Sequence, residues 1–420
     1  MPANQDLLLL FVYAVVLLAA VLISARAHRT VLSTAVLFLL AGIVLGEGDL
    51  GLIRLDPGDP IVVGLAEAAL FVVLFTDGMR LGWHDLRSAW RLPGRALLFG
   101  MPMTMAITAV LAYWLTGLGV VECLLLGAVL APTDPVFAAA LVGNERVPAR
   151  LRQMLNVESG LNDGLALPMV IVLLEVASQE PTDIGRLAVD LLLGIVVGVV
   201  VPWVVLRLER SRVFASSEEY VAITAVAIAL LVVSLCELTN ANLFLAAFTA
   251  GITVATRGRR EAEAFRELGE LIAELLKLAA LLVFGLLISL PFLSEIPFAG
   301  WVFAILALVL ARPLALLLAL ARSGLSRREK GAAMWFGPKG FASVVYGLFV
   351  LQSGIDEADA LFHLAALTIA LSIIAHSSTD VVVARAFDAP DEVPAWIDDP
   401  AAPPAPAREG RPQKGTDPPS

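Results

Sequence analysis

Long apolar runs separated by short polar segments extend over most of this chain. An α-helix rises about 1.5 Å per residue, so roughly 20 apolar residues cross the hydrocarbon layer of a bilayer. About thirteen runs are long enough, and together they predict an all-α polytopic membrane protein. They cover residues 6–24, 31–46, 61–80, 94–117, 120–142, 153–177, 184–207, 218–237, 240–256, 270–290, 298–320, 330–352 and 358–383.

Two of these runs are interrupted by residues that break helices. The fifth contains APTDP at 131–135, and the twelfth contains GPKG at 337–340. Proline removes a backbone donor, and non-helical backbone at this depth is tolerated only where it is buried in protein or lines a cavity. Because the two spans run in opposite directions, the pattern indicates an inverted-repeat secondary transporter whose site lies where the breaks cross.

The interruptions also suggest how the chain is divided. We expect one transmembrane domain over residues 1–387, with two inverted repeats of six helices at about 6–177 and 218–383. A linker helix at about 184–207 would join the two repeats. Residues 388–420 are rich in proline and poor in large apolar groups, which predicts a disordered cytoplasmic tail.

Basic residues lie in alternate loops. The loops at 47–60, 178–183 and 353–357 contain Arg54 alone, whereas the intervening loops carry several Lys and Arg each. An excess of Lys and Arg marks cytoplasmic loops. We therefore expect a multi-pass protein of the cell membrane, with its N-terminus outside and its C-terminus in the cytoplasm.

Composition excludes several classes of function. Of the 420 residues, 59% are hydrophobic and 16% are charged, and the mean hydropathy of +0.85 excludes a soluble globular protein. Membrane lipid is the expected surroundings, and the chain lacks the basic stripe of a nucleic-acid partner. Cys123 and Cys236 offer neither a disulfide framework nor metal-ligand spacing. No cofactor and no enzyme activity are expected.

Carboxylates inside apolar spans are the candidate chemistry. A charge near mid-membrane costs at least about 2.5 kcal/mol, so Asp134 and Asp163 need a functional reason. Ser159, Asn162 and Asp163 share one face of a helix, and Thr133 adds a hydroxyl at similar depth. These hard oxygens predict a site for an alkali cation. Because a single acid can be neutralised by either a cation or a proton, competition between the two would produce exchange.

Other intramembrane charges receive supporting roles. We expect Arg312 to pair with Glu158, because a guanidinium at that depth requires a carboxylate. Lys339 is expected to face carbonyl ends at the break of the twelfth span, and Asp77 to line the approach from the cytoplasm. Lys277 is assigned nothing. Gly194 and Gly198 predict a close helix contact, which we expect at a protomer interface.

These motifs resemble the NhaP-type sodium/proton antiporters, members of the monovalent cation/proton antiporter superfamily and relatives of the animal sodium/hydrogen exchangers. The resemblance covers roughly residues 1–385. It is carried by the TDPV sequence at 133–136, the ES and ND pairs at 158–159 and 162–163, the AR pair at 311–312, and the GPKG break. Lys339 departs from the family, which commonly has Arg at that position.

The resemblance implies a fold, a site and an assembly. The fold would be NhaA-like, with crossed, interrupted helices and a moving six-helix core, in a homodimer. Asp163 would bind Na⁺, K⁺, Li⁺ or H⁺ with help from Thr133, Asp134 and Ser159, and Asn162 would orient the break of the fifth span. Glu158 and Arg312 would form a structural ion pair. With Asn162 beside a single acid, exchange would be electroneutral.

Two other functions stay open. A cation channel or facilitator is the first, although no selectivity-filter sequence is visible. An intramembrane aspartyl protease using Asp134 and Asp163 is more remote, because the glycine-flanked catalytic sequences expected there are missing and the neighbouring prolines would disturb catalytic positioning.

Overall fold

The computed structural model describes residues 2–27, 34–46, 51–80, 91–134, 141, 143–178, 184–211, 214, 217–288 and 290–387. Helices make up this part of the chain, and it contains no strand. The elements are α1 (Pro2–Ala27), α2 (Thr34–Leu45), α3 (Pro60–Arg80), α5 (Arg91–Arg95), η1 (Ala96–Gly100), α6 (Met101–Thr116), α7 (Val120–Val129), α9 (Ala149–Ala177), α10 (Ile184–Glu209), η3 (Glu218–Tyr220), α11 (Val221–Thr239), α12 (Leu243–Arg257), α13 (Arg259–Leu287), α14 (Leu290–Glu295), α15 (Phe298–Leu306), η4 (Ala307–Ala311), α16 (Arg312–Ala319), α17 (Arg327–Trp335), α18 (Phe341–Gln352) and α19 (Ala358–Arg385).

The helices agree with the prediction of a polytopic membrane protein. Within the described residues, 8 helices are long and apolar enough to cross a bilayer, and α2, α7, α12 and α18 are shorter apolar helices. Two of the short ones border the interruptions predicted from the prolines and glycines: α7 ends before the first, and α18 begins after the second. The predicted tail at 388–420 lies outside the described residues.

One segment differs from the expectation. The charged stretch at 258–270 separates the predicted spans at 240–256 and 270–290, but α13 runs without interruption from Arg259 to Leu287. No proline or glycine pair divides this stretch, so the charged and apolar parts share one continuous helix. Its side chains at 270, 274 and 277 consequently follow one another on a single face.

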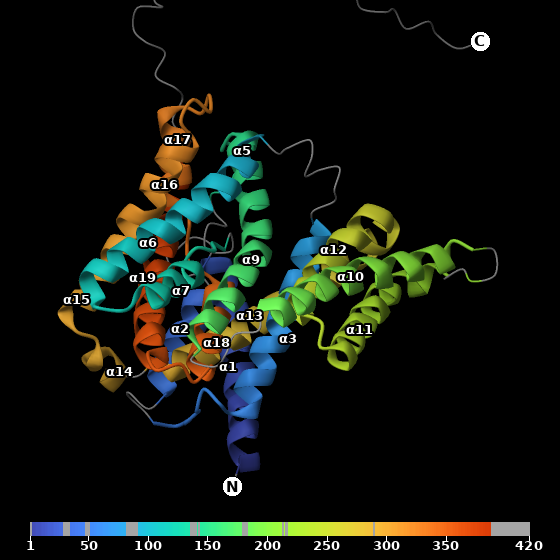
Figure 1. The fold of residues 1–420 in the computed structure, drawn as a ribbon, viewed down its shortest axis with the longest axis horizontal. Helices are drawn as coiled ribbons and strands as arrows, with labels where there is room; N and C mark the ends of the chain where they lie inside the picture. Colours follow the sequence, from blue (N-terminus) through green and yellow to red (C-terminus); the bar gives the residue numbers. More distant parts are fainter. Residues whose placement is uncertain are drawn as a thin grey trace, which may run out of the picture.

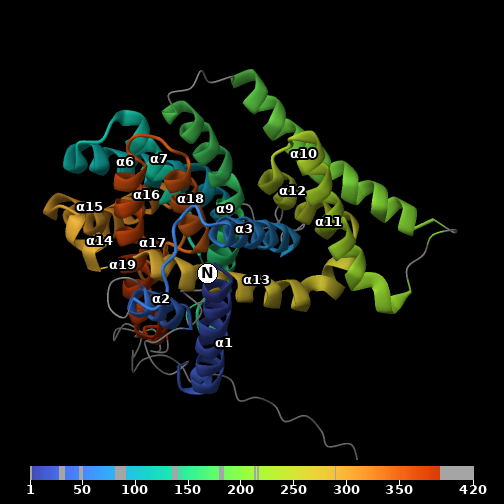
Figure 2. The ribbon, with the colours of Figure 1, turned by 90° about the horizontal axis from the view of Figure 1, so that it is seen from below.

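The helices form two groups. Helices α5, α6, α7 and α9 gather with α15 to α19 in one bundle, and α10, α11 and α12 lie together on the other side (Figures 1 and 2). Helices α3 and α13 lie between the groups, where α3 contacts both α9 and α12, and α13 contacts both α18 and α11. The two central helices therefore join the bundle to the second group, and α9 also contacts α12 directly.

Glycines allow the closest contacts between helices. A Cβ on Gly78 of α3 would lie 2.5 Å from the Phe248 carbonyl oxygen of α12, and a side chain on Gly251 of α12 would overlap the α3 backbone. Gly194 and Gly198 of α10 face α12 of the same chain in the same way. The expectation that they lie at a protomer interface is therefore wrong, because α12 already occupies their surface.

The bundle contains two matching helix distortions. The π-helical turn η1 precedes Pro102, and the π-helical turn η4 precedes Pro313. Proline cannot donate its backbone nitrogen, so the helix widens locally where that bond is missing. Each π turn packs against the partner helix, η1 against α16 and η4 against α6. The second distortion lies immediately before Arg312.

We expect Gly78→Leu to destabilise the protein by about 2–3 kcal/mol, because the new side chain would force α3 away from the α12 backbone. Thermal unfolding of purified protein measures this. Gly64→Leu on the same helix is the matched control, since a Cβ at Gly64 meets nothing within 4 Å. Equal melting temperatures for the two variants would contradict the close contact between α3 and α12.

Candidate cation site

The two interrupted segments cross in the middle of the bundle. The Asp134 backbone N–H donates to the Pro338 carbonyl oxygen at 2.9 Å. The Phe341 N–H, at the first position of α18, points at Asp134 Oδ2 at 3.4 Å. A helix N-terminus carries a partial positive charge, so the N-terminus of α18 attracts this carboxylate. The crossing expected from the sequence is confirmed on the described side of the fifth-span break, while Pro135 and Val136 lie outside the described residues.

The two glycines of the second break make room for two charged side chains. A Cβ at Gly340 would overlap the Asp134 side chain, and one at Gly337 would overlap Arg312. Neither position tolerates a larger residue without movement of the neighbouring charge. The GPKG sequence therefore both interrupts the helix and fits the surface of two other segments.

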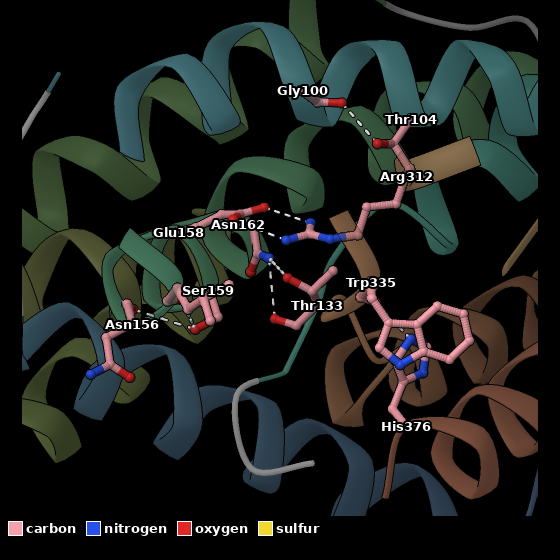
Figure 3. Close-up of polar contacts among 11 residues, drawn as sticks. Gly100, Thr104, Thr133, Asn156, Glu158, Ser159, Asn162, Arg312, Trp335 and His376 are labelled. Carbon is pink, nitrogen blue, oxygen red and sulfur yellow. Dashed lines mark hydrogen bonds and ion pairs between the residues drawn. The ribbon is translucent and has the colours of Figure 1, made fainter. Parts of the chain in front are cut away.

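Helix α9 presents a row of polar groups to the first break. Asn162 Nδ2 donates to the Thr133 backbone oxygen at 3.1 Å and to Thr133 Oγ1 at 2.7 Å (Figure 3). Ser159 Oγ donates to the Leu155 carbonyl, which leaves its lone pairs available. The Tyr346 hydroxyl of α18 donates to the backbone oxygen of Asp163 at 2.7 Å. Together these bonds fix α9 against both interrupted spans.

A cavity of about 430 Å³ lies beside this row. Its lining residues are Asp77, Arg80, Asp134, Asn156, Val157, Ser159, Gly160, Asp163 and Lys277. Asp163 is 5% exposed, and its Oδ1 has no hydrogen-bond partner among the described residues. An ionised carboxylate held in that state is costly, so the position calls for a proton or a cation.

The expected site residues fall into two layers. Asp163, Asp134, Ser159 and Asp77 lie on the cavity. Thr133 and Asn162 are bonded to each other and are absent from its lining. Asp77, at the C-terminal end of α3, accepts a bond from Arg80 Nη1 at 3.2 Å.

Glu158 and Arg312 form a buried fork behind the cavity. Arg312 Nη1 donates to Glu158 Oε1 at 2.6 Å, and Arg312 Nη2 donates to Glu158 Oε2 at 3.0 Å (Figure 3). The side chains are 4% and 8% exposed respectively. Because this bidentate pair satisfies both carboxylate oxygens and connects α9 to α16, its geometry suits a structural contact.

Lys339 differs in part from the expectation. It is buried within the break, and its backbone N–H donates to Ser372 Oγ at 2.8 Å. Its Nζ has no hydrogen-bond acceptor among the described residues, so the expected contact with carbonyl ends is not formed. Lys339 also does not line the cavity beside Asp163.

Sequence reasoning missed Lys277. This residue of α13 lines the cavity, and its Nζ lies 4.0 Å from Asp134 Oδ2. The only available signal was the series of charged residues at positions 270, 274 and 277 in the first part of the predicted span at 270–290. That spacing fixes a shared face but not the helix that the face meets.

Comparison with known proteins gives a consistent result. The model of the transmembrane sodium/hydrogen exchanger family matches residues 14–385. The K⁺/H⁺ antiporter NhaP2 of Shewanella baltica is 24% identical over 394 residues, covering 92% of this chain and 68% of that protein. The K⁺/H⁺ antiporter NhaP of Alkalimonas amylolytica is 26% identical over 387 residues, covering 91% and 67%. The chain thus spans about two thirds of the length of these relatives.

A solved structure establishes the fold. The sodium proton antiporter MjNhaP1 from Methanocaldococcus jannaschii superimposes with a TM-score of 0.75, covering 90% of this chain and 98% of that one at 20% identity. The expected antiporter fold with crossed, interrupted helices is confirmed.

We expect Glu158→Ala to lower stability by about 3–5 kcal/mol, because it leaves the Arg312 guanidinium buried without its carboxylate. Melting with and without added cation separates this loss from an effect on binding. The double variant Glu158→Leu with Arg312→Met removes both charges and should recover much of the stability. A Glu158→Ala protein that melts normally but binds cations weakly would make Glu158 a ligand instead.

Proposed function

The chain belongs to the sodium/hydrogen exchanger family, and we propose that it exchanges a monovalent cation for H⁺ across the membrane by alternating access. Asp163 is the group that carries either ion. The observation behind this assignment is its buried carboxylate, which faces a cavity with one oxygen unpartnered among the described residues.

Competition for one carboxylate explains the coupling. A cation stabilises the ionised form of Asp163 and a proton removes it, so each excludes the other. An empty, ionised acid is costly to carry through a low-dielectric barrier. The protein therefore changes its accessible side when Asp163 is occupied, and one ion crosses in each direction.

The proposed cation ligands are the carboxylate of Asp163 and the hydroxyl of Ser159, which line the cavity, together with Thr133 of the first break, which lies outside this lining in the structure. Asp134 lies on the same cavity, at the N-terminus of α18. Asp77 extends the acidic lining toward the end of α3. Asn162 holds Thr133 and stays neutral at all pH values. A single titrating acid in this pair supports electroneutral exchange, with one cation per proton.

The inverted repeats at about 6–177 and 218–383 are also proposed, with α10 as the linker. Two pairs of matching features support them. The breaks in the fifth and twelfth spans cross, and the π turns before Pro102 and Pro313 occur in the fourth span of each half. Relative movement of the bundle against the second group would then alternate access to the cavity.

Orientation and assembly complete the proposal. The N-terminus lies at the end of the molecule opposite α5 and α17, which begin among basic residues (Figure 1). This arrangement supports an N-terminus outside and a C-terminus in the cytoplasm of the cell membrane. A homodimer is proposed from the resemblance to NhaP-type antiporters.

The transported ion is proposed to be Na⁺, K⁺ or Li⁺. Relatives named as K⁺/H⁺ antiporters make K⁺ as important to test as Na⁺. Proteoliposomes loaded with a pH dye should report proton movement when each cation is added, without a membrane potential. A current that persists without a proton gradient and scales as a conductance would favour a channel.

We expect Asp163→Asn to abolish exchange while the protein stays folded, since the uncharged amide can neither bind a proton nor neutralise the charge of a bound cation. The dye assay measures the rate, and thermal unfolding checks the fold. Asp359→Asn makes the same chemical change at an exposed acid in the first turn of α19 and should exchange normally. Wild-type rates in Asp163→Asn would remove this residue from the site.

A further inference from the structure

Lys277 is a half-buried cation in a cavity that three aspartates line. Asp77, Asp134 and Asp163 line this cavity with it, and they come from α3, the first break and α9. The Lys277 side chain is 12% exposed and that of Asp134 is 7% exposed. The Lys277 ammonium therefore contributes to the net charge of the lining residues, and this net charge acts on any cation that enters the cavity.

The second positive group of the cavity is already engaged. Arg80 donates to Asp77 at 3.2 Å and to Glu270 at 3.3 Å, and its side chain is 44% exposed. Lys277 has no such close partner among the described residues, because its Nζ stays 4.0 Å from Asp134 Oδ2, beyond hydrogen-bond distance. It is held near the acids without being locked onto one of them.

We propose that Lys277 is a tethered counter-ion that competes with the transported cation for the acidic cavity. This inference rests on the exchange proposed above. When no cation is bound, the ammonium partly neutralises the three carboxylates. When a cation arrives, the two positive charges repel each other, so the cation binds more weakly than the carboxylates alone would allow.

The proposal has a second consequence, for the pH range of exchange. The carboxylates whose charges act on Lys277 are Asp134, Asp77, Glu274 and Asp163, while Arg80 and Glu270 lie at the edge and the Tyr346 hydroxyl binds the Asp163 backbone. A proton that binds one of these carboxylates brings a second positive charge close to the ammonium, which repels it as it repels a metal cation. Lys277 therefore extends exchange to lower pH while weakening cation binding.

Lys277→Gln tests both consequences in proteoliposomes. Well above the pH of half-maximal rate, where protons no longer compete, the half-saturating concentration of the transported cation should fall about tenfold. The acid limit of exchange should move to higher pH. Lys277→Arg keeps the charge and should stay close to wild type in both measurements. A purely structural lysine would change the amount of folded protein or the maximal rate, and would leave both measurements unchanged.

Lys330→Gln is the matched control, since it makes the same substitution in α17, outside the cavity lining. An active Lys277→Gln protein with an unchanged half-saturating concentration and pH profile overturns the inference and leaves the proposed exchange intact. A wild-type protein that exchanges no cation would refute the exchange itself, together with the inference that rests on it.

Lys277→His keeps the test decisive if Lys277→Gln does not fold. The imidazole is charged at low pH and neutral at high pH, so one folded protein samples both states. The half-saturating concentration of the transported cation for Lys277→His, divided by that for wild type, should fall as pH rises. A ratio to wild type that is constant with pH would overturn the proposal.

Discussion

The bond from the Asp134 N–H to the Pro338 carbonyl is the contact on which the site depends. Each interrupted span exposes backbone groups that the apolar surroundings cannot satisfy, and the two interruptions satisfy each other where they cross. The same crossing brings the α18 N-terminus to the Asp134 carboxylate. The prolines would destabilise each helix in isolation. Where the two helices cross, the polar groups that the breaks expose bind one another and form the polar centre of the bundle.

The charges around this centre are divided between two compartments. Glu158 and Arg312 neutralise each other in a fork that connects α9 to α16. Asp77, Asp134, Asp163 and Lys277 face the cavity. The fork satisfies both carboxylate oxygens of Glu158, whereas one carboxylate oxygen of Asp163 has no hydrogen-bond partner among the described residues. The first compartment therefore holds the helices and the second is available for an ion.

Features of the structure that depend on a few neighbouring residues could be predicted from the sequence. Prolines and acids inside apolar runs identify the breaks, Asp134 and Asp163, because their cost in a bilayer does not depend on the fold. Lys277 and the partners of Gly194 depend on how helices are rotated and packed, and a single sequence does not encode that rotation in any local pattern. The continuous α13 was missed for a related reason: a charged segment beside an apolar one resembles a boundary even when no residue breaks the helix.

The hydrogen bonds of Asn162 explain why an amide stands beside Asp163. Its Nδ2 donates to both the backbone oxygen and the hydroxyl of Thr133. A carboxylate in the same position could not donate to the backbone oxygen and would be repelled by it, so the first break would lose its attachment to α9. An amide also has no proton to exchange in this pH range. The bond that anchors the break therefore leaves Asp163 as the only acid of the pair.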